Sequence, residues 1–190
     1  MSRQAKAYVT SAEYLALERQ AEYKSEYYDG EIFAMTGASR RHNLISLSVG
    51  GKLYSRLLDS PCEVYSGDMR VRVPATGLYT YPDVVVVCGE PKFEDEHVDT
   101  LLNPVLIVEV LSKSTARYDR IDKFAHYRSI PSFAEYLLVS QDEYRVEHNA
   151  RQPDGRWLLT DIRGKEEQVV LSSVGCALAL ADIYDRVNFD

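Results

Sequence analysis

Hydrophobic residues recur with helical spacing in several parts of the chain. The sequence Thr10–Glu13 forms a capping box that predicts the start of a short helix. Ser39 is placed to cap a second helix, because leucines together with Ile45 and Val49 form an apolar stripe of helical spacing to about Leu58. A third helical pattern covers 112–128, and a short terminal helix is predicted over 178–187.

Two glycine-containing pairs interrupt these patterns. Asp29-Gly30 lies between aromatic and β-branched residues and predicts a hairpin whose strands lie within 22–28 and 31–35. Gly50-Gly51 falls inside the second helix, where each glycine is unfavourable by about 1 kcal/mol relative to alanine. We therefore expect this helix to pack closely against another element at the glycines.

Runs of β-branched residues predict the strands. They occupy 62–66, 69–73, 81–88, 105–111, 135–139, 144–148 and 157–162. The runs Val84–Val87 and Val105–Val108 are apolar on both faces, which is typical of central strands covered by helices. The order of elements predicts an α/β or α+β fold with a mixed central β-sheet flanked by helices, in one domain over residues 1–190.

Composition narrows the possible partners and the compartment. The net charge of −7, from 22 basic and 29 acidic side chains, argues against an all-basic surface for wrapping nucleic acid. No stretch approaches the roughly 20 apolar residues of a membrane span, so no membrane partner is expected. Cys62, Cys88 and Cys176 lack zinc-site spacing, which predicts free thiols in a reducing cytoplasm.

Two acidic residues are embedded in the predicted central strands. Glu109 lies within Leu106–Leu111, and Asp83 follows Pro82 at the start of the other doubly apolar run. A buried carboxylate is costly unless it is paired, hydrogen-bonded or bound to a cation. If the two strands are neighbours, both carboxylates can bind one Mg²⁺, which takes one or two carboxylates. The alternative is a structural Glu and a structural Asp, each satisfied by an arginine or by backbone.

The helix that follows Glu109 supplies a cation. Asp119, Lys123 and Tyr127 are spaced four residues apart and share one helix face. A surface acid–lysine pair is the ordinary interpretation. Directly after the Glu109 strand, however, the ammonium can orient an attacking water or stabilise charge that develops on a phosphate.

Other polar residues occur earlier in the chain. Glu26 and Glu31 flank the hairpin turn. We expect Glu26 to be an exposed charge, whereas for Glu31 a place in the carboxylate site and an exposed position are equally compatible with the sequence. Arg40, Arg41 and His42 begin the second helix, where they either hold a phosphate or are solvated. The chain has no GxSxG, P-loop or GxGxxG motif, which disfavours triad and nucleotide-binding chemistry.

The order of these motifs resembles the PD-(D/E)xK nuclease superfamily, and within it the Uma-type family of restriction-endonuclease-like bacterial proteins. The matching segments span about 22–140: Glu26 through Glu31, His42, Ser66–Val71, Tyr81–Val84, Val108–Ser112, Ser114-Thr115, Asp119 with Lys123 and Tyr127, and Ile130-Pro131 before Glu135-Tyr136. The resemblance implies a restriction-endonuclease-like mixed sheet and a metal-dependent endonuclease that hydrolyses phosphodiester bonds of DNA.

The resemblance also implies roles for individual residues. Asp83 and Glu109 would bind Mg²⁺ or Mn²⁺ together with the backbone carbonyl of Val110, and Glu31 would extend the site. Lys123 would position the attacking water. The bound metal would lower the pKa of that water and neutralise the developing charge.

One position departs from the superfamily motif. The motif places a lysine two residues after the glutamate, where this chain has Leu111. Lys123 is the candidate replacement, and Lys113 is a weaker one. The competing explanation is an inactive copy of the fold that acts as a nucleic-acid-binding or regulatory module. A third interpretation is a non-nuclease enzyme that uses the same carboxylates on a small phosphate or carbonyl substrate.

We expect a homodimer, because superfamily nucleases that cut both strands often pair. Given the net charge, any DNA contact must be confined to a cleft. Candidates to line it are the basic residues Arg40, Arg41, Arg70, Arg72, Lys113 and Arg117, with His42 and Tyr127 as further substrate-binding candidates.

Overall fold

The computed structural model describes residues 8–189, and its largest sheet is mixed and six-stranded. Its strands, from one edge to the other, are β11 (Trp157–Arg163), β10 (Arg145–Arg151), β9 (Glu135–Val139), β8 (Leu106–Val110), β6 (Val84–Cys88) and β3 (Cys62–Ser66). Strands β8 and β9 are parallel, and the other neighbours are antiparallel. The prediction of a mixed central sheet is confirmed, and β6 and β8 are neighbours inside it, which meets the condition set for Asp83 and Glu109 to lie close together.

A second sheet and a separate hairpin complete the strands. The second sheet contains β2 (Glu31–Ala34), β1 (Ser25–Tyr28), β5 (Leu78–Thr80), β4 (Arg70–Val73) and β7 (Thr100–Leu101), in that order. The hairpin pairs β12 (Gln168–Leu171) with β13 (Cys176–Ala179). The sequence did not predict β5, β7 or this hairpin. The helix predicted over 178–187 is shorter than expected, because β13 occupies its first residues.

Five helices and one wider helical turn accompany the sheets. They are α1 (Ser11–Glu18), α2 (Arg40–Arg56), α3 (Ala116–Tyr118), the π-helical turn η1 (Asp119–Lys123), α4 (Phe124–Tyr127) and α5 (Leu180–Ile183). The predicted capping box is present at Thr10, and the Ser39 side chain accepts a hydrogen bond from the His42 backbone N–H. None of the helices within 8–189 is long and apolar enough to cross a membrane.

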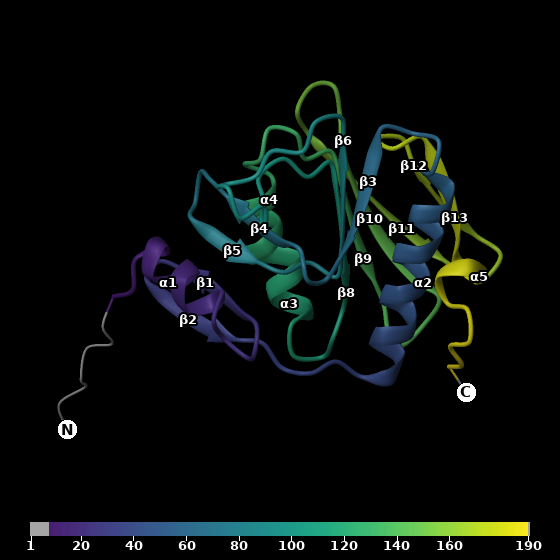
Figure 1. Ribbon diagram of the computed structural model, residues 1–190. Coiled ribbons are helices and arrows are strands. Elements are labelled where there is room, and N and C mark those ends of the chain that lie inside the picture. Colours follow the sequence, from purple (N-terminus) through teal and green to yellow (C-terminus); the bar gives the residue numbers. More distant parts are fainter. Residues whose placement is uncertain (1–7, 190) are drawn as a thin grey trace.

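The six-stranded sheet has a hydrophobic core on each face. On one face, α2, α5 and the β12–β13 hairpin pack against the even-numbered residues of β6 and β8, such as Val84 and Val108. On the other face, β4, β5 and the helical segment α3–η1–α4 pack against odd-numbered residues such as Val85 and Ile107. Figure 1 shows these two layers on opposite sides of the sheet. The alternation explains why both central strands consist of apolar residues without interruption.

Gly50 and Gly51 differ in their surroundings. A Cβ built on Gly50 would lie 3.6 Å from the Val84 side chain, which agrees with the expected close approach of α2 to the sheet. A Cβ on Gly51 would meet nothing within 4 Å. The packing explanation therefore holds for Gly50 and is wrong for Gly51.

The prediction of three free thiols is also wrong. Cys62 and Cys88 are cross-strand partners in β3 and β6, with Cα atoms 3.9 Å apart, and they form a disulfide. Cys176 is a free thiol. The spacing of the cysteines in the sequence could not show the pairing, because it results from the antiparallel register of the two strands. A reducing cytoplasm stays an expectation from the sequence.

Candidate active site

Asp83 and Glu109 lie opposite each other where β6 begins and β8 ends, on neighbouring strands inside the large sheet. In the antiparallel register of β6 and β8, Val84 pairs with Val108, and extending the register by one residue places Asp83 opposite Glu109. Side chains in such pairs lie about 5 Å apart at their Cβ atoms. Asp83 Oδ2 accepts a hydrogen bond from the Val110 backbone N–H at 2.7 Å, which fixes this carboxylate beside β8.

Lys123 is surrounded by three carboxylates. Its Nζ lies 2.9 Å from Glu26 Oε1, 3.2 Å from Glu109 Oε1 and 3.6 Å from Asp119 Oδ1. The Lys123 side chain is only 8 % exposed. The helical segment that carries Lys123 covers the face of the sheet to which Glu109 points, so the lysine reaches this carboxylate from above the strand.

Burial and mutual charge determine the protonation of this cluster. Burial raises the pKa of Glu109 well above its usual range, and three neighbouring carboxylates raise it further while Lys123 lowers it. Burial likewise raises the pKa of Asp119. Burial disfavours the charged form of Lys123, but the carboxylates outweigh it and raise the lysine pKa well above its ordinary value. The centre therefore holds a permanent cation and a surplus of acidic groups.

A second pair of side chains holds Asp83. His42 Nε2 lies 2.7 Å from Asp83 Oδ1, and Gln141 Nε2 lies 3.5 Å from His42 Nδ1. Gln141 also donates to the Leu111 carbonyl at 2.8 Å, and its Oε1 accepts from the Ser39 hydroxyl. His42 therefore contacts a carboxylate of the centre. The sequence had left open whether it holds a phosphate or is solvated.

Of the two hairpin carboxylates, Glu26 lines the cleft and Glu31 does not. Glu26, expected to be exposed, lines the cleft and pairs with Lys123. Glu31 is exposed and lies next to the turn, where it pairs across the hairpin with Tyr28. Glu26 pairs with Phe33, so Glu31 is two residues, or about 7 Å, farther along the same hairpin face. Among the described residues, Glu26 is the hairpin carboxylate that lines the cleft.

Tyr127 is fully buried, and its hydroxyl donates to Glu109 Oε1 at 3.0 Å. It therefore positions Glu109, which corrects the expectation that it contacts a substrate. Arg41 and Lys113 line the cleft, whereas Arg40 is exposed at the start of α2, outside the cleft lining.

Other basic candidates are committed to structural contacts. Arg70 is 3 % exposed, donates to Thr100 and Tyr81, and pairs with Asp99. Arg72 pairs with Glu94. Arg117 is exposed and is not one of the described residues that line the cleft.

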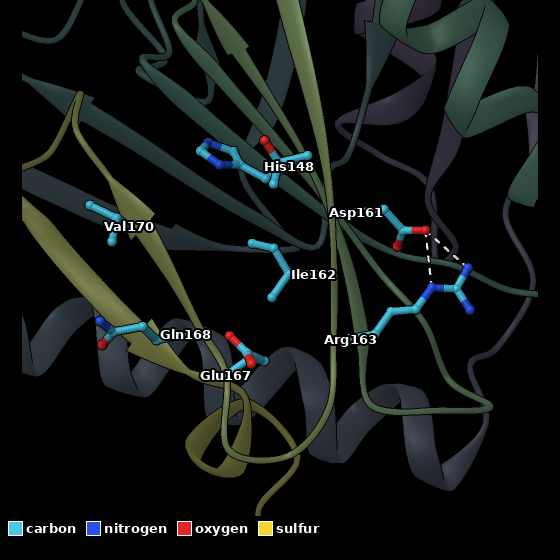
Figure 2. A pocket seen from close by; sticks show the side chains of 8 residues that line it. His148, Asp161, Ile162, Arg163, Glu167, Gln168 and Val170 are labelled. Carbon is cyan, nitrogen blue, oxygen red and sulfur yellow. Dashed lines mark hydrogen bonds and ion pairs between the residues drawn. The ribbon is translucent and has the colours of Figure 1, made fainter.

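These groups open into a cleft of about 1540 Å³. It extends from the β1–β2 hairpin across Asp83 and Glu109 to α2. A smaller pocket of about 600 Å³ lies where β10 and β11 meet the β12–β13 hairpin (Figure 2). Most of its charged groups already have partners, because Arg163 pairs with Asp161 at 2.9 Å and His148 Nε2 lies 3.1 Å from Glu135. The larger cleft is therefore the candidate active site.

The donors in the cleft suit a hard divalent cation. No three His, Cys, Asp or Glu side chains between residues 8 and 189 are arranged to hold a metal ion by themselves. Mg²⁺ needs only one or two carboxylates, together with water and phosphate oxygens. Asp83 and Glu109 supply carboxylate oxygens, and Asp119 Oδ1 is buried nearby without a hydrogen-bond partner. Their chemistry fits Mg²⁺ or Mn²⁺.

Two members of this centre escaped sequence reasoning. Glu26 shares the hairpin with Glu31, and nothing local distinguishes the two carboxylates. Gln141 follows β9 in a loop, and no motif identified it. The one available signal was its position directly after a fully buried strand at the sheet centre, where side chains face a cleft.

Comparison with known proteins agrees with the fold and the motif order. A family model described as Uma2, "Putative restriction endonuclease", matches residues 11–181. The chain is 43 % identical over 164 residues to an uncharacterized Synechocystis protein, sll1609, covering 86 % of this chain and 93 % of that one. It is 35 % identical over 177 residues to a second, slr1290, covering 93 % and 92 %.

A solved structure shares the fold. It is described as a "putative nuclease belonging to DUF820" from Anabaena variabilis, and it superposes with a TM-score of 0.78 at 18 % identity. The match covers 95 % of this chain and 99 % of that one. Together with the family match over nearly the whole length, this shows that the chain belongs to the Uma2 family and has its restriction-endonuclease-like fold.

Proposed function

We propose that this protein is a divalent-metal-dependent endonuclease that hydrolyses phosphodiester bonds of DNA. The observation that carries the proposal is the geometry of three residues: Asp83 opposite Glu109 on neighbouring strands, with Lys123 Nζ 3.2 Å from Glu109 Oε1. The descriptions of the family and of the structural neighbour both point to nucleases.

Each residue of the centre has a distinct role in this proposal. Asp83 and Glu109 would hold Mg²⁺ or Mn²⁺, which when bound lowers the pKa of water and neutralises charge on a phosphate. His42 and the Val110 N–H keep Asp83 oriented. Lys123 orients the attacking water and remains positively charged because of its carboxylate neighbours.

Nicking of supercoiled DNA tests the proposal directly. The purified protein should nick the plasmid with Mg²⁺ or Mn²⁺ and should be inactive in chelator. Asp83→Ala and Glu109→Ala should abolish nicking. The catalytic assignment fails if the parent does not nick, or if either variant nicks as well as the parent.

The hairpin provides a matched pair of carboxylate variants. Glu26→Gln removes a partner of Lys123, so nicking should fall strongly. Glu31→Gln removes a carboxylate two residues farther along the same hairpin face, and nicking should stay near the parental rate. Equal loss in both variants would contradict the assignment of Glu26 to the site.

Lys123→Ala separates catalysis from metal binding. Turnover should be lost, while calorimetry should still detect Mn²⁺ binding through Asp83 and Glu109. Loss of both would identify Lys123 as a structural residue.

A second candidate function rests on one observation: Leu111 occupies the motif lysine position and packs in a hydrophobic core. In that case the protein is a nucleic-acid-binding or regulatory module without catalysis. DNA binding that is unaffected by chelator and by Glu109→Ala would favour this candidate. Heat of Mn²⁺ binding that vanishes in Glu109→Ala would favour the enzyme.

We also propose that the enzyme acts as a homodimer, because nucleases of the superfamily it resembles often pair. Light scattering at micromolar concentration should give twice the 21.6 kDa chain mass. A monomer under those conditions would contradict the proposal.

A further inference from the structure

We propose that the substrate-binding cleft takes unpaired nucleotides, whose bases stack on aromatic side chains exposed in its walls. This inference rests on the proposed function and specifies its substrate class as single-stranded nucleic acid or an unpaired region. The observations that carry it are the exposure of the rings, their positions around Glu109, and the charge of the cleft.

Three exposed aromatic rings line the cleft. Tyr23 precedes β1 and is 80 % exposed, Phe33 in β2 is 47 % exposed, and Tyr54 in α2 is 62 % exposed. Leu47 precedes Tyr54 by seven residues, or two turns, on the same face of α2; it is 75 % exposed and also lines the cleft. Exposed apolar groups that gather on one surface mark interaction sites, and three rings in one cleft indicate a ligand with flat apolar faces.

The rings line the same cleft as the carboxylate centre. Phe33 is the cross-strand partner of Glu26, whose carboxylate contacts Lys123 at 2.9 Å. Tyr54 lies on α2, the helix that also carries His42, and lines the same cleft. A strand that contacts both Phe33 and Tyr54 therefore lies in the cleft that contains the proposed catalytic residues.

The charge of the cleft disfavours a duplex held by its backbone. The lining contains seven carboxylates and four Lys or Arg side chains. Of these cations, Lys123 is buried among carboxylates, and Lys24 pairs with Asp68 at 2.9 Å. Duplex DNA carries one negative charge per about 1.7 Å of axis and is bound chiefly through many Lys and Arg contacts. Here the available affinity comes from ring surfaces, and bases offer their faces to rings only when they are unpaired.

The test compares binding of a labelled 20-nucleotide single strand with binding of the same sequence as a duplex. Fluorescence anisotropy is measured in Ca²⁺ and again in EDTA, and a gel verifies that the probe is intact. The single strand should bind at least about tenfold tighter. The salt dependence of its binding should be shallow, with a slope no steeper than about −1.5, because at most two cleft cations, Arg41 and Lys113, can meet phosphates.

Variants of the rings test the stacking itself. Phe33→Ala and Tyr54→Ala should each weaken single-strand binding by about 5- to 150-fold. Tyr54→Phe, which keeps the ring, should retain binding. Leu159→Ala is the control, because Leu159 is 55 % exposed in β11, outside the cleft lining, and should bind as the parent does.

Four results would overturn the inference: equal or tighter binding of the duplex, unchanged binding in both alanine variants, absence of binding to either probe, or a dimer that dissociates in Tyr54→Ala. The last result would assign the ring to a subunit interface. The binding assay requires no cleavage, so failure of the nuclease proposal appears separately, as a bound oligonucleotide that Mg²⁺ and Mn²⁺ do not cause to be cut.

Discussion

Replacing Lys123 by Met tests the electrostatics of the proposed active site. The substitution keeps an unbranched chain but removes the ammonium from among Glu26, Glu109 and Asp119. Opposite unit charges about 3 Å apart attract by about 5 kcal/mol at the effective dielectric constant of about 20 that suits protein sites. Desolvation offsets much of this, so the expected loss is that for a buried pair deprived of one partner, about 3–5 kcal/mol in the free energy of unfolding.

The pH dependence of this loss has a defined sign. Without the lysine, the folded-state pKa of the buried carboxyls rises further above the unfolded value of about 4.3 for glutamate. A raised carboxyl pKa destabilises the folded protein where the group is ionised in the unfolded chain, and protonation removes that penalty as the pH falls. The difference between parent and Lys123→Met should therefore be larger at pH 8 than at pH 5.5.

Urea unfolding in chelator, followed by circular dichroism, measures the difference. Lys113→Met is the matched control, because Lys113 is an exposed lysine of the same cleft and should change stability by no more than about 0.5 kcal/mol. A loss below about 1 kcal/mol for Lys123→Met at pH 8 would refute the view that this lysine neutralises buried acids.

Three further predictions concern stability. Burial raises the pKa of Glu135, but hydrogen bonds from His148 and a serine outweigh burial, so the pKa is lowered. The resulting stabilisation of the folded state is present above about pH 4.3 and is lost as the pH falls through the folded-state pKa. Glu135→Gln should therefore flatten the acid-side decline of the urea midpoint, and an unchanged decline would contradict this. Gly51→Ala should raise the unfolding free energy by about 1 kcal/mol, since the helical site is open, and a decrease would reveal a contact there. Reduction of the disulfide between Cys62 and Cys88, which are 26 residues apart, should lower the unfolding free energy by up to about 3.5 kcal/mol. The number of thiols titrated in denaturant should rise from one to three per chain on reduction. Three thiols before reduction would show that the bond is absent.

The sequence predicted those features that depend on local patterns. The uninterrupted apolar runs identified β6 and β8 as central, because residues of both parities face a hydrophobic core. The caps at Thr10 and Ser39 are local hydrogen bonds within a few residues. Asp119 and Lys123 were grouped correctly, since their spacing alone places them on one helix face.

The missed features depend on contacts between distant segments. The short strands β5 and β7, of three and two residues, are too short to show a period and exist because they pair with β4. Glu26 could not be preferred over Glu31, since both point to the same hairpin face. Only the packing of the hairpin beside the helix of Lys123 decides which carboxylate meets the lysine.

The displaced lysine can be understood from the alternation of side chains along β8. Residues 109 and 111 lie on the same face of the sheet, so a lysine at 111 would point to the side on which Glu109 lies. In this chain Leu111 instead joins the hydrophobic core under the α3–η1–α4 segment, and that segment carries Lys123, which lies on the same face of the sheet.

The ammonium thus comes from the helix above the strand, where it also meets Glu26 of the hairpin. The same helix contributes Tyr127, which donates to the oxygen of Glu109 that Lys123 contacts, so one segment both supplies the cation and orients the carboxylate. A leucine at the motif position is therefore compatible with the proposed nuclease centre, because the proposed chemistry requires a cation within reach of Glu109 and not its origin in the strand.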